Sequence, residues 1–175
     1  MRKTIGVTVL GALALAAGAA ASQNGQKYNL VANLKAANEV PTPTGVRTSA
    51  VGLFTAKVTE QSNGSAKVTW KLTFKNLTGK AMAAHIHLGK KGVSGPVALA
   101  LCGPCKSGQT GSGVLTKAQW SAVEHGGGYV NVHTAKNANG EIRGQIKSSA
   151  GGSGSSSSSS SSNGSSGGYG SGYGS

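Results

Sequence analysis

An unbroken alternation of apolar and polar residues over positions 66–75 constrains the fold more than any other feature of this sequence. The apolar positions are Val68, Trp70, Leu72 and Phe74. Lysine or threonine occupies each position between them, and residues 27–35 and 50–58 alternate in the same way. A period of two places apolar side chains on one face of an extended strand and polar side chains on the other. The pattern predicts antiparallel strands with one buried face.

Turn signals divide the rest of the chain into further short elements. Asn139-Gly140 is typical of a hairpin turn, because both residues accept the backbone conformation that such turns require. Additional strands are predicted around His85 and over residues 97–101, 129–134 and 141–147. A capping-box spacing at Thr116 and Gln119 predicts one short helix near residues 116–125. These elements predict an all-β, antiparallel β-sandwich, either immunoglobulin-like or superoxide-dismutase-like.

The two ends of the chain differ in composition from the middle. Two basic residues, an apolar run over residues 5–17 and small residues near position 21 have the three parts of a secretory signal peptide, which we assign to residues 1–22. Residues 148–175 are almost entirely serine and glycine, with two tyrosines. They are expected to form a disordered tail, because they can bury too little apolar surface to offset the entropy of ordering. A single domain is therefore expected over residues 23–147.

The leader sets the expected localisation. Its apolar run is short and rich in glycine and alanine, whereas a membrane span needs about 20 strongly apolar residues. No second apolar run follows, so no transmembrane span is predicted in the mature chain. The mature protein is expected to be secreted, either periplasmic or extracellular, after cleavage of the signal peptide.

The mature chain is strongly basic. Without Arg2 and Lys3 it keeps 15 basic and 4 acidic side chains, a formal charge of +11. This charge favours an anionic polymer or cell-surface component as partner, and a protein partner is left open. The basic residues are dispersed, so no short run indicates a specific nucleic-acid site. Lys67, Lys71 and Lys75 share the outer face of one predicted strand, which is either the face for an anionic partner or an ordinary solvated face.

Three of the four histidines lie in predicted strands. His85 and His87 are two positions apart, so they share one strand face at a spacing of about 7 Å. His133 lies on another strand, in phase with Tyr129 and Asn131. If the two strands are neighbours, the three imidazoles converge into a ligand set suited to zinc or copper. The alternative is a polar seam in which the imidazoles hydrogen-bond to backbone carbonyls and carboxylates.

Glu39 and Glu141 stand out because acidic residues are so few. An arginine fork binds a carboxylate through two parallel hydrogen bonds, so Arg143 is expected to form a structural ion pair with Glu39 or Glu141. A glycosidase-like pair of carboxylates is the alternative, and it requires a cleft and a raised pKa. We assign no catalytic residue and do not predict an enzyme.

Cys102 and Cys105 form a Cys-x-x-Cys motif. In an exported chain this spacing favours a local disulfide. A thioredoxin-like redox role is disfavoured, because glycines follow the motif and no helix N-terminus is there to lower the pKa of a thiol. Binding of a soft metal together with the histidines is a further alternative.

Five segments of the chain form an ordered set of motifs. They are Asn38-Glu39-Val40-Pro41, Ala84-His85-Ile86-His87-Leu88-Gly89, Gly92 with Gly95-Pro96-Val97, Gly128-Tyr129-Val130-Asn131-Val132-His133-Thr134 and Gly140-Glu141-Ile142-Arg143-Gly144-Gln145. Together they resemble the CHRD domain, a module first named from chordin and also found in secreted bacterial proteins. The resemblance covers about residues 27–147 and implies an extracellular, β-sandwich-like domain. Chordin-type animal proteins bind growth factors, whereas this chain resembles a single-domain bacterial-type member without the cysteine-rich modules.

Two hypotheses for function follow. The first is an exported structural or binding module that engages an anionic surface or matrix component. The second is an extracytoplasmic copper- or zinc-binding protein that uses His85, His87 and His133. The first requires a cationic face whose binding weakens with salt, and the second requires the three imidazoles to converge.

Overall fold

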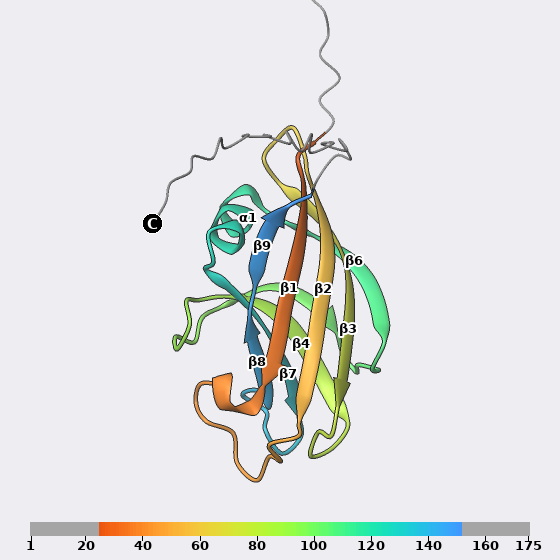
Figure 1. Ribbon diagram of the computed structural model, residues 1–175, viewed down its shortest axis with the longest axis vertical. Coiled ribbons are helices and arrows are strands. Elements are labelled where there is room, and N and C mark those ends of the chain that lie inside the picture. The colour runs from red at the N-terminus through yellow and green to blue at the C-terminus, as the bar shows by residue number, and fades with distance from the viewer. Residues whose placement is uncertain (1–24, 152–175) are drawn as a thin grey trace, which may run out of the picture.

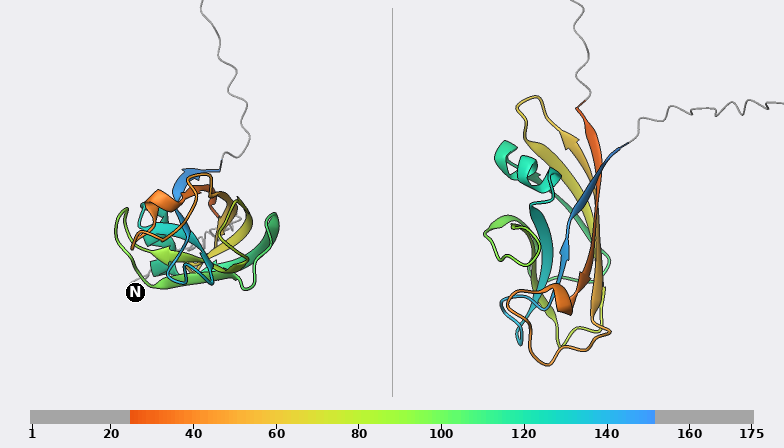
Figure 2. Two further views of the ribbon diagram at one scale, coloured as in Figure 1. Left: turned by 90° about the horizontal axis from the view of Figure 1, so that it is seen from below. Right: turned by 60° about the vertical axis from the view of Figure 1, so that its left-hand side comes forward.

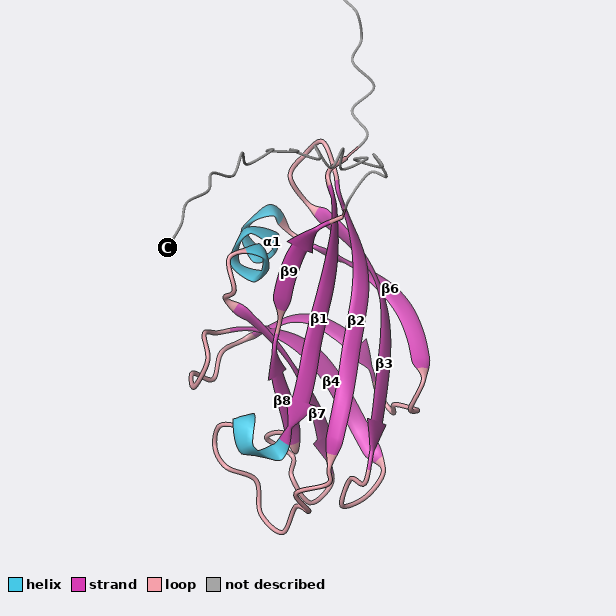
Figure 3. Cartoon of the chain, in the orientation of Figure 1, coloured by secondary structure: helices cyan, strands magenta, loops and turns pink. Residues whose placement is uncertain are grey.

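The structure, a computed structural model, describes residues 25–151, which form nine strands, one α-helix and one short 3-10 helix (Figure 3). The strands are β1 (Lys27–Lys35), β2 (Val51–Glu60), β3 (Ala66–Lys75), β4 (Ala81–Leu88), β5 (Val97–Cys102), β6 (Gln109–Leu115), β7 (Gly128–Thr134), β8 (Ile142–Gln145) and β9 (Lys147–Ala150). The helices are η1 (Ala36–Asn38) and α1 (Lys117–Glu124). The predicted all-β, antiparallel class with one short α-helix is confirmed. The signal peptide expected at residues 1–22 lies outside the described residues, as does the expected tail from residue 152 onward.

One antiparallel sheet contains all of these strands. Its order is β5-β4-β7-β8-β1-β2-β3-β6, and β9 also pairs with β1. The sheet curls until its two halves face each other, so that β1, β2 and β3 pass in front of β4 and β7 (Figure 1). The end-on view in Figure 2 shows the strands arranged around a common interior. Strand β1 belongs to both halves, because it pairs with β2 on one edge and with β8 and β9 on the other.

The alternating residues predicted to point inward do line this interior. Tyr28, the first of them, is partly exposed. The inward positions from Leu30 to Leu34 on β1, from Phe54 to Val58 on β2 and from Ala66 to Leu72 on β3 are at most 6 % exposed, and the residues between them lie toward solvent. The opposite half contributes Ile86, Val130, Val132 and Ile142, each with no exposed surface. The core therefore lies between the two halves of one curled sheet, as in a β-sandwich.

Helix α1 begins at the capping box that the sequence predicted. Thr116 Oγ1 accepts a hydrogen bond from Gln119 N at 3.3 Å, and Gln119 Oε1 accepts one from Thr116 N at 2.8 Å. The helix buries Trp120 and Val123, and the Trp120 ring meets Tyr28 edge to face with 4.9 Å between centroids. Within residues 25–151, no helix is both long enough and apolar enough to cross a membrane.

Strand β6 was not predicted, because glycines interrupt its sequence. It pairs with β3 from Leu115 to Gln109. A Cβ at Gly111 would lie 2.4 Å from Cζ2 of Trp70, and a Cβ at Gly113 would lie 2.6 Å from Cδ1 of Leu99. The side chains of Trp70 and Leu99 occupy the space above these glycines. The glycines therefore remove the apolar alternation that would predict a strand, but they also leave room for the strand to pack.

Strand β9 extends the domain past the predicted boundary at residue 147. Residues 147–150 pair with β1 from Val31 to Tyr28, so Ser148, Ser149 and Ala150 belong to the sheet and not to a tail. Serine lacks an apolar side chain, but strand pairing uses backbone groups that every residue except proline supplies. The pairing covers half of β1 that would otherwise be an exposed sheet edge.

Candidate metal centre

The three histidines of the predicted cluster lie on the adjacent strands β4 and β7. In the register of these strands, His85 lies opposite Asn131, His87 lies opposite Tyr129, and His133 lies opposite Ala83, two inter-strand pairs beyond His85. The residues between them point into the core, so these five side chains share the outer face of this half of the sheet. The strand adjacency on which the sequence hypothesis depended is therefore present.

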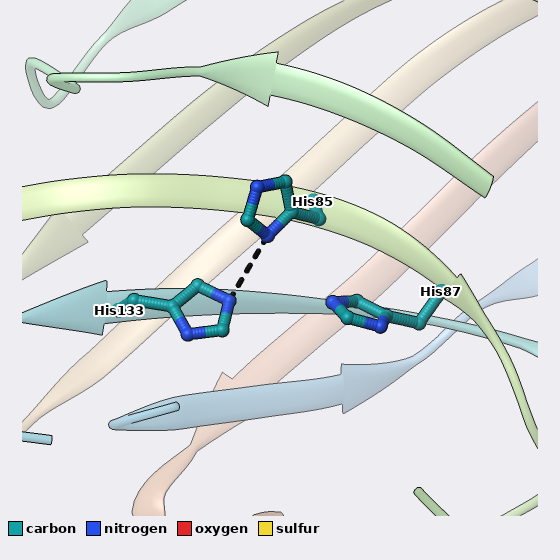
Figure 4. Close-up of side chains that lie close together, drawn as sticks. All are labelled: His85, His87 and His133. Carbon is teal, nitrogen blue, oxygen red and sulfur yellow. Dashed lines mark hydrogen bonds between the residues drawn. The ribbon is translucent and has the colours of Figure 1, made fainter. Parts of the chain in front are cut away.

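The imidazoles converge in space. His85 Nδ1 lies 3.0 Å from His133 Nε2, and one ring nitrogen from each of the three residues lies within 4.8 Å of the others. The ring centroid of His87 lies 5.5 Å from that of His85 and 6.2 Å from that of His133. Figure 4 shows the three rings turned toward one shared space from two strands. This is the arrangement that a three-nitrogen ligand set requires.

In His87 and His133, a hydrogen bond to a backbone carbonyl determines which ring nitrogen keeps its lone pair. His87 Nδ1 lies 2.9 Å from Gly95 O, and His133 Nδ1 lies 2.9 Å from Ala138 O. A carbonyl oxygen can only accept, so each Nδ1 carries the proton and each Nε2 carries the lone pair. Nε2 of His87 is buried and has no hydrogen-bond partner among the described residues. Histidines that bind metals are held in this way, with the second nitrogen donating to a carbonyl or carboxylate.

The environment favours the neutral form of His85 and His133. Burial, together with the neighbouring His133 and His87, lowers the pKa of His85 to about 4. Burial also lowers the pKa of His133, despite the opposing effect of its hydrogen bond to Ala138. At neutral pH His85 and His133 therefore offer lone pairs. The hydrogen bond between these two rings is the alternative to metal coordination by the same atoms.

Tyr129 and Arg143 support the cluster from the side. The rings of Tyr129 and His87 are stacked, with 4.9 Å between centroids and 8° between planes. The Arg143 guanidinium lies over the Tyr129 ring, with its carbon 3.4 Å from the centroid. Tyr129 Oη also accepts a hydrogen bond from Gly95 N at 3.2 Å, so the loop over residues 89–96 holds both stacked rings. Sequence reasoning gave Tyr129 no role, although its phase with His133 was a signal for its place on this face.

The direct ion pair predicted for Arg143 is not formed among residues 25–151. Its Nη2 atom instead donates to Lys90 O at 3.0 Å and to Val93 O at 2.8 Å. The guanidinium lies under the loop formed by residues 89–96, where these carbonyls need donors, and this explains the difference. Arg143 therefore anchors the loop that positions His87.

Glu141 is bound by neutral donors. Its carboxylate accepts hydrogen bonds from the backbone and hydroxyl of Thr78, from the hydroxyl of Thr134 and from the amide of Asn137. Burial acts to raise the pKa of this carboxyl, but the hydrogen bonds from Thr134, Thr78 and Asn137 outweigh burial and hold the pKa below its usual range. Glu141 ties the loop before β4 to the hairpin between β7 and β8.

Glu39 is almost completely buried, with 4 % of its surface exposed. Oε1 accepts a hydrogen bond from Val40 N at 3.2 Å, whereas Oε2 has no partner among the described residues. Burial raises the pKa of this carboxyl to about 7, although Arg143 acts in the opposite direction. The backbone of Gly140, at φ +130°, passes so close that a Cβ there would lie 2.3 Å from Glu39 Oε2. Glu39 is therefore a buried acid without an ion-pair partner in contact.

The other predicted site residues lie elsewhere. Cys102 and Cys105 form the expected disulfide, which leaves no thiolate to join the histidines. Lys67, Lys71 and Lys75 are exposed on β3, in the opposite half of the sheet from the cluster. The structure thus brings together the three histidines alone as a possible ligand set within residues 25–151.

Comparison with known proteins gives one match. The model of the CHRD domain family matches residues 30–146, a segment that contains all three histidines together with Tyr129 and Arg143. No curated protein and no solved structure is detectably similar to the chain.

Proposed function

The chain belongs to the CHRD domain family, whose match supports a binding-type module, and from this premise we propose that it is an exported protein that binds a copper or zinc ion through His85, His87 and His133. The single observation that carries the proposal is the pair of hydrogen bonds from Nδ1 of His87 and His133 to backbone carbonyls. They leave the two Nε2 atoms with lone pairs beside the His85 ring. A satisfied polar seam would give every buried ring nitrogen a partner, whereas Nε2 of His87 is buried and has none among the described residues.

The donor set restricts the metal. Three neutral imidazoles suit zinc and copper, whereas calcium and magnesium prefer oxygen ligands. Zinc–nitrogen distances are about 2.0–2.1 Å. Ring nitrogens that lie within 4.8 Å of one another can reach such distances through small side-chain rotations. Three protein ligands leave a fourth position for water or a ligand molecule.

Metal titration tests this proposal. Protein purified without chelator is titrated with Zn²⁺ and with Cu²⁺, and one ion per chain is expected for at least one of them. His87→Ala is expected to weaken binding at least about tenfold, as loss of a ligand does. The matched control is His125→Ala, because His125 lies at the end of α1 and its side chain bonds only to Ser121 O among the described residues. No uptake by the native protein, or equal loss in both variants, overturns the proposal.

The lysine distribution favours a second function, the binding of anionic polymers. Seven lysines lie on the outer face of β1, β2, β3 and β9, in phase with the solvent-facing positions: Lys27, Lys35, Lys57, Lys67, Lys71, Lys75 and Lys147. None of the four acidic residues of the sequence lies on this face. A one-sign face of this kind attracts polyanions through a field that salt screens.

A salt series tests the second function. Retention on an anionic polysaccharide column is expected to fall steeply with ionic strength, and to fall further in the triple variant Lys67→Ala, Lys71→Ala, Lys75→Ala. The electrostatic argument is contradicted if neither salt nor this variant changes the retention.

A further inference from the structure

A basic pocket opens on the outer face where β1 meets β8 and β9, beside the loop formed by residues 89–96. Its volume is about 340 Å³. Four of the side chains that line it are cationic, Lys35, Lys91, Arg143 and Lys147, and none is acidic. No histidine lines the pocket. Its Lys35 and Lys147 belong to the lysine face and its Arg143 packs on Tyr129, but neither proposed function has so far assigned the cavity itself a role.

Strand register builds the pocket. Lys35 pairs with Arg143 across β1 and β8, and Val31 pairs with Lys147 across β1 and β9. The outward-facing residues of β1 form one row of the pocket floor, and those of β8 and β9 form a second row beside it. Gly144 makes the close approach possible, because a Cβ there would lie 2.5 Å from Asn33 O. The cations are thus brought together by the fold and not by neighbouring positions in the sequence.

Arg143 gives the pocket a fixed charge. Its side chain is 1 % exposed and is held by two carbonyls and by the Tyr129 ring. Its Nη1 atom is buried and has no hydrogen-bond partner among the described residues. No carboxylate contacts this guanidinium there, so its charge is left for an anion bound above it.

The shape and the remaining side chains point to a sugar unit. The volume is at the lower end of the range of about 300–1,000 Å³ that is usual for small-molecule sites. Asn38 and Gln145 already donate their amide protons to backbone carbonyls, so their amide oxygens are left to accept from hydroxyl groups. Val31 offers an apolar patch for the face of a ring. A flat bilayer or a wide duplex cannot enter such a concavity.

We propose that this pocket binds an acidic sugar unit of an anionic polysaccharide, with the sugar's oxyanion among Lys35, Lys91 and Lys147 above Arg143 and its hydroxyls on Asn38 and Gln145. The inference deepens the second proposed function, polyanion binding, and rests on it. The broad lysine face would supply attraction at a distance, and the pocket would supply selection of the monomer.

The test compares two double variants that remove the same charge. Lys91→Ala with Lys147→Ala alters the pocket rim, whereas Lys67→Ala with Lys71→Ala alters the distant part of the lysine face. Binding of galacturonic acid and of galactose 6-sulfate is measured by titration followed by NMR, with galactose as the neutral control. Polygalacturonate, anionic phospholipid vesicles and polyphosphate are tested as polymers or surfaces.

The expected result is at least a tenfold loss of acidic-sugar and polygalacturonate affinity in the pocket variant, which is the loss that about two charged contacts produce. The face variant is expected to keep its affinity for the monosaccharides. Whether carboxylate or sulfate binds more tightly identifies the acid group.

Equal losses in the two variants, or equal binding of galactose, overturn the pocket proposal while polyanion binding stands. Pocket-dependent binding of vesicles or polyphosphate in place of sugar also overturns it, and failure of every polyanion to bind overturns the second proposed function itself.

Discussion

The guanidinium carbon of Arg143 lies 3.4 Å from the centroid of the Tyr129 ring, and this ring in turn stacks on the imidazole of His87. Because β7 lies between β4 and β8, Tyr129 stands between the other two side chains. The same arginine holds the loop whose Gly95 carbonyl orients His87. One side chain thus supports the candidate metal centre by two routes.

Replacing Arg143 by lysine is expected to weaken both routes. Lysine keeps the charge but loses the planar fork that bonds two carbonyls and covers the ring. We expect a loss of about 1–3 kcal/mol in the free energy of unfolding, measured by urea titration. We also expect metal affinity to fall about tenfold, as when the support of a ligating histidine is lost. Lys57→Ala, an exposed change on β2, is the control, and an equal effect there contradicts the prediction.

Replacing Glu141 by glutamine is expected to destabilise the fold by about 2–4 kcal/mol, because an amide presents donors to groups that are already donors. The hydrogen bonds from Thr78, Thr134 and Asn137 hold the pKa of Glu141 below its usual value of 4.5 in the folded state. Its stabilising contribution is therefore present above pH 4.5 and is lost as the pH falls through the folded pKa. Urea unfolding at pH 7 measures the loss, with Glu60→Gln as the matched charge change. A difference below 1 kcal/mol would count against this role.

Glu39 is expected to make stability fall as the pH rises. Burial raises the pKa of Glu39 from 4.5 to about 7, so the unfolded chain releases this proton at lower pH than the folded chain does. The folded state then loses stability between pH 4.5 and 7, by about 3 kcal/mol. Glu39→Gln removes this dependence. The measurement is the difference in unfolding free energy between variant and native protein at pH 5 and pH 8, because the difference cancels the titration of the histidines. Parallel curves for the two proteins would show the prediction to be wrong.

Gly144→Ala is expected to destabilise the junction of β1 and β8. The added Cβ would lie 2.5 Å from Asn33 O, a backbone atom that cannot move aside alone. Overpacking of this kind costs about 1–3 kcal/mol, and we expect it to impair acidic-sugar binding as well. Thermal and urea unfolding measure the effect. Gly79→Ala is the control, because a Cβ there meets nothing within 4 Å.

Local patterns in the sequence predicted the part of the fold that depends on one segment at a time. The alternation over residues 27–35 and 66–75 predicted which faces are buried, and the spacing of Thr116 and Gln119 predicted where α1 begins. The glycine-rich strand β6 was missed because its stability comes from Trp70 and Leu99, which fill the space above its glycines. Patterns within a segment carry no information about such partners.

The candidate site was predictable in its residues but not in its contacts. The shared phase of His85 and His87 predicted a common face, and strand adjacency then brought in His133. The partners of Arg143 could not be predicted, because they are backbone carbonyls of Lys90 and Val93, and any residue type offers a carbonyl. For the same reason, nothing in the sequence marked Gly95 and Ala138 as the groups that orient the imidazoles.

The double pairing of β1 has a kinetic consequence. Tyr28, near the start of the described chain, pairs with Ala150 near its end, and β1 also bridges the two halves of the sheet. Long-range pairings of this kind make folding slow, because a large loop must close before they form. A nascent chain that lacks its last strands cannot complete the sheet around β1. Among the described residues, the first strand to be synthesised therefore reaches its final environment only after the last one has appeared.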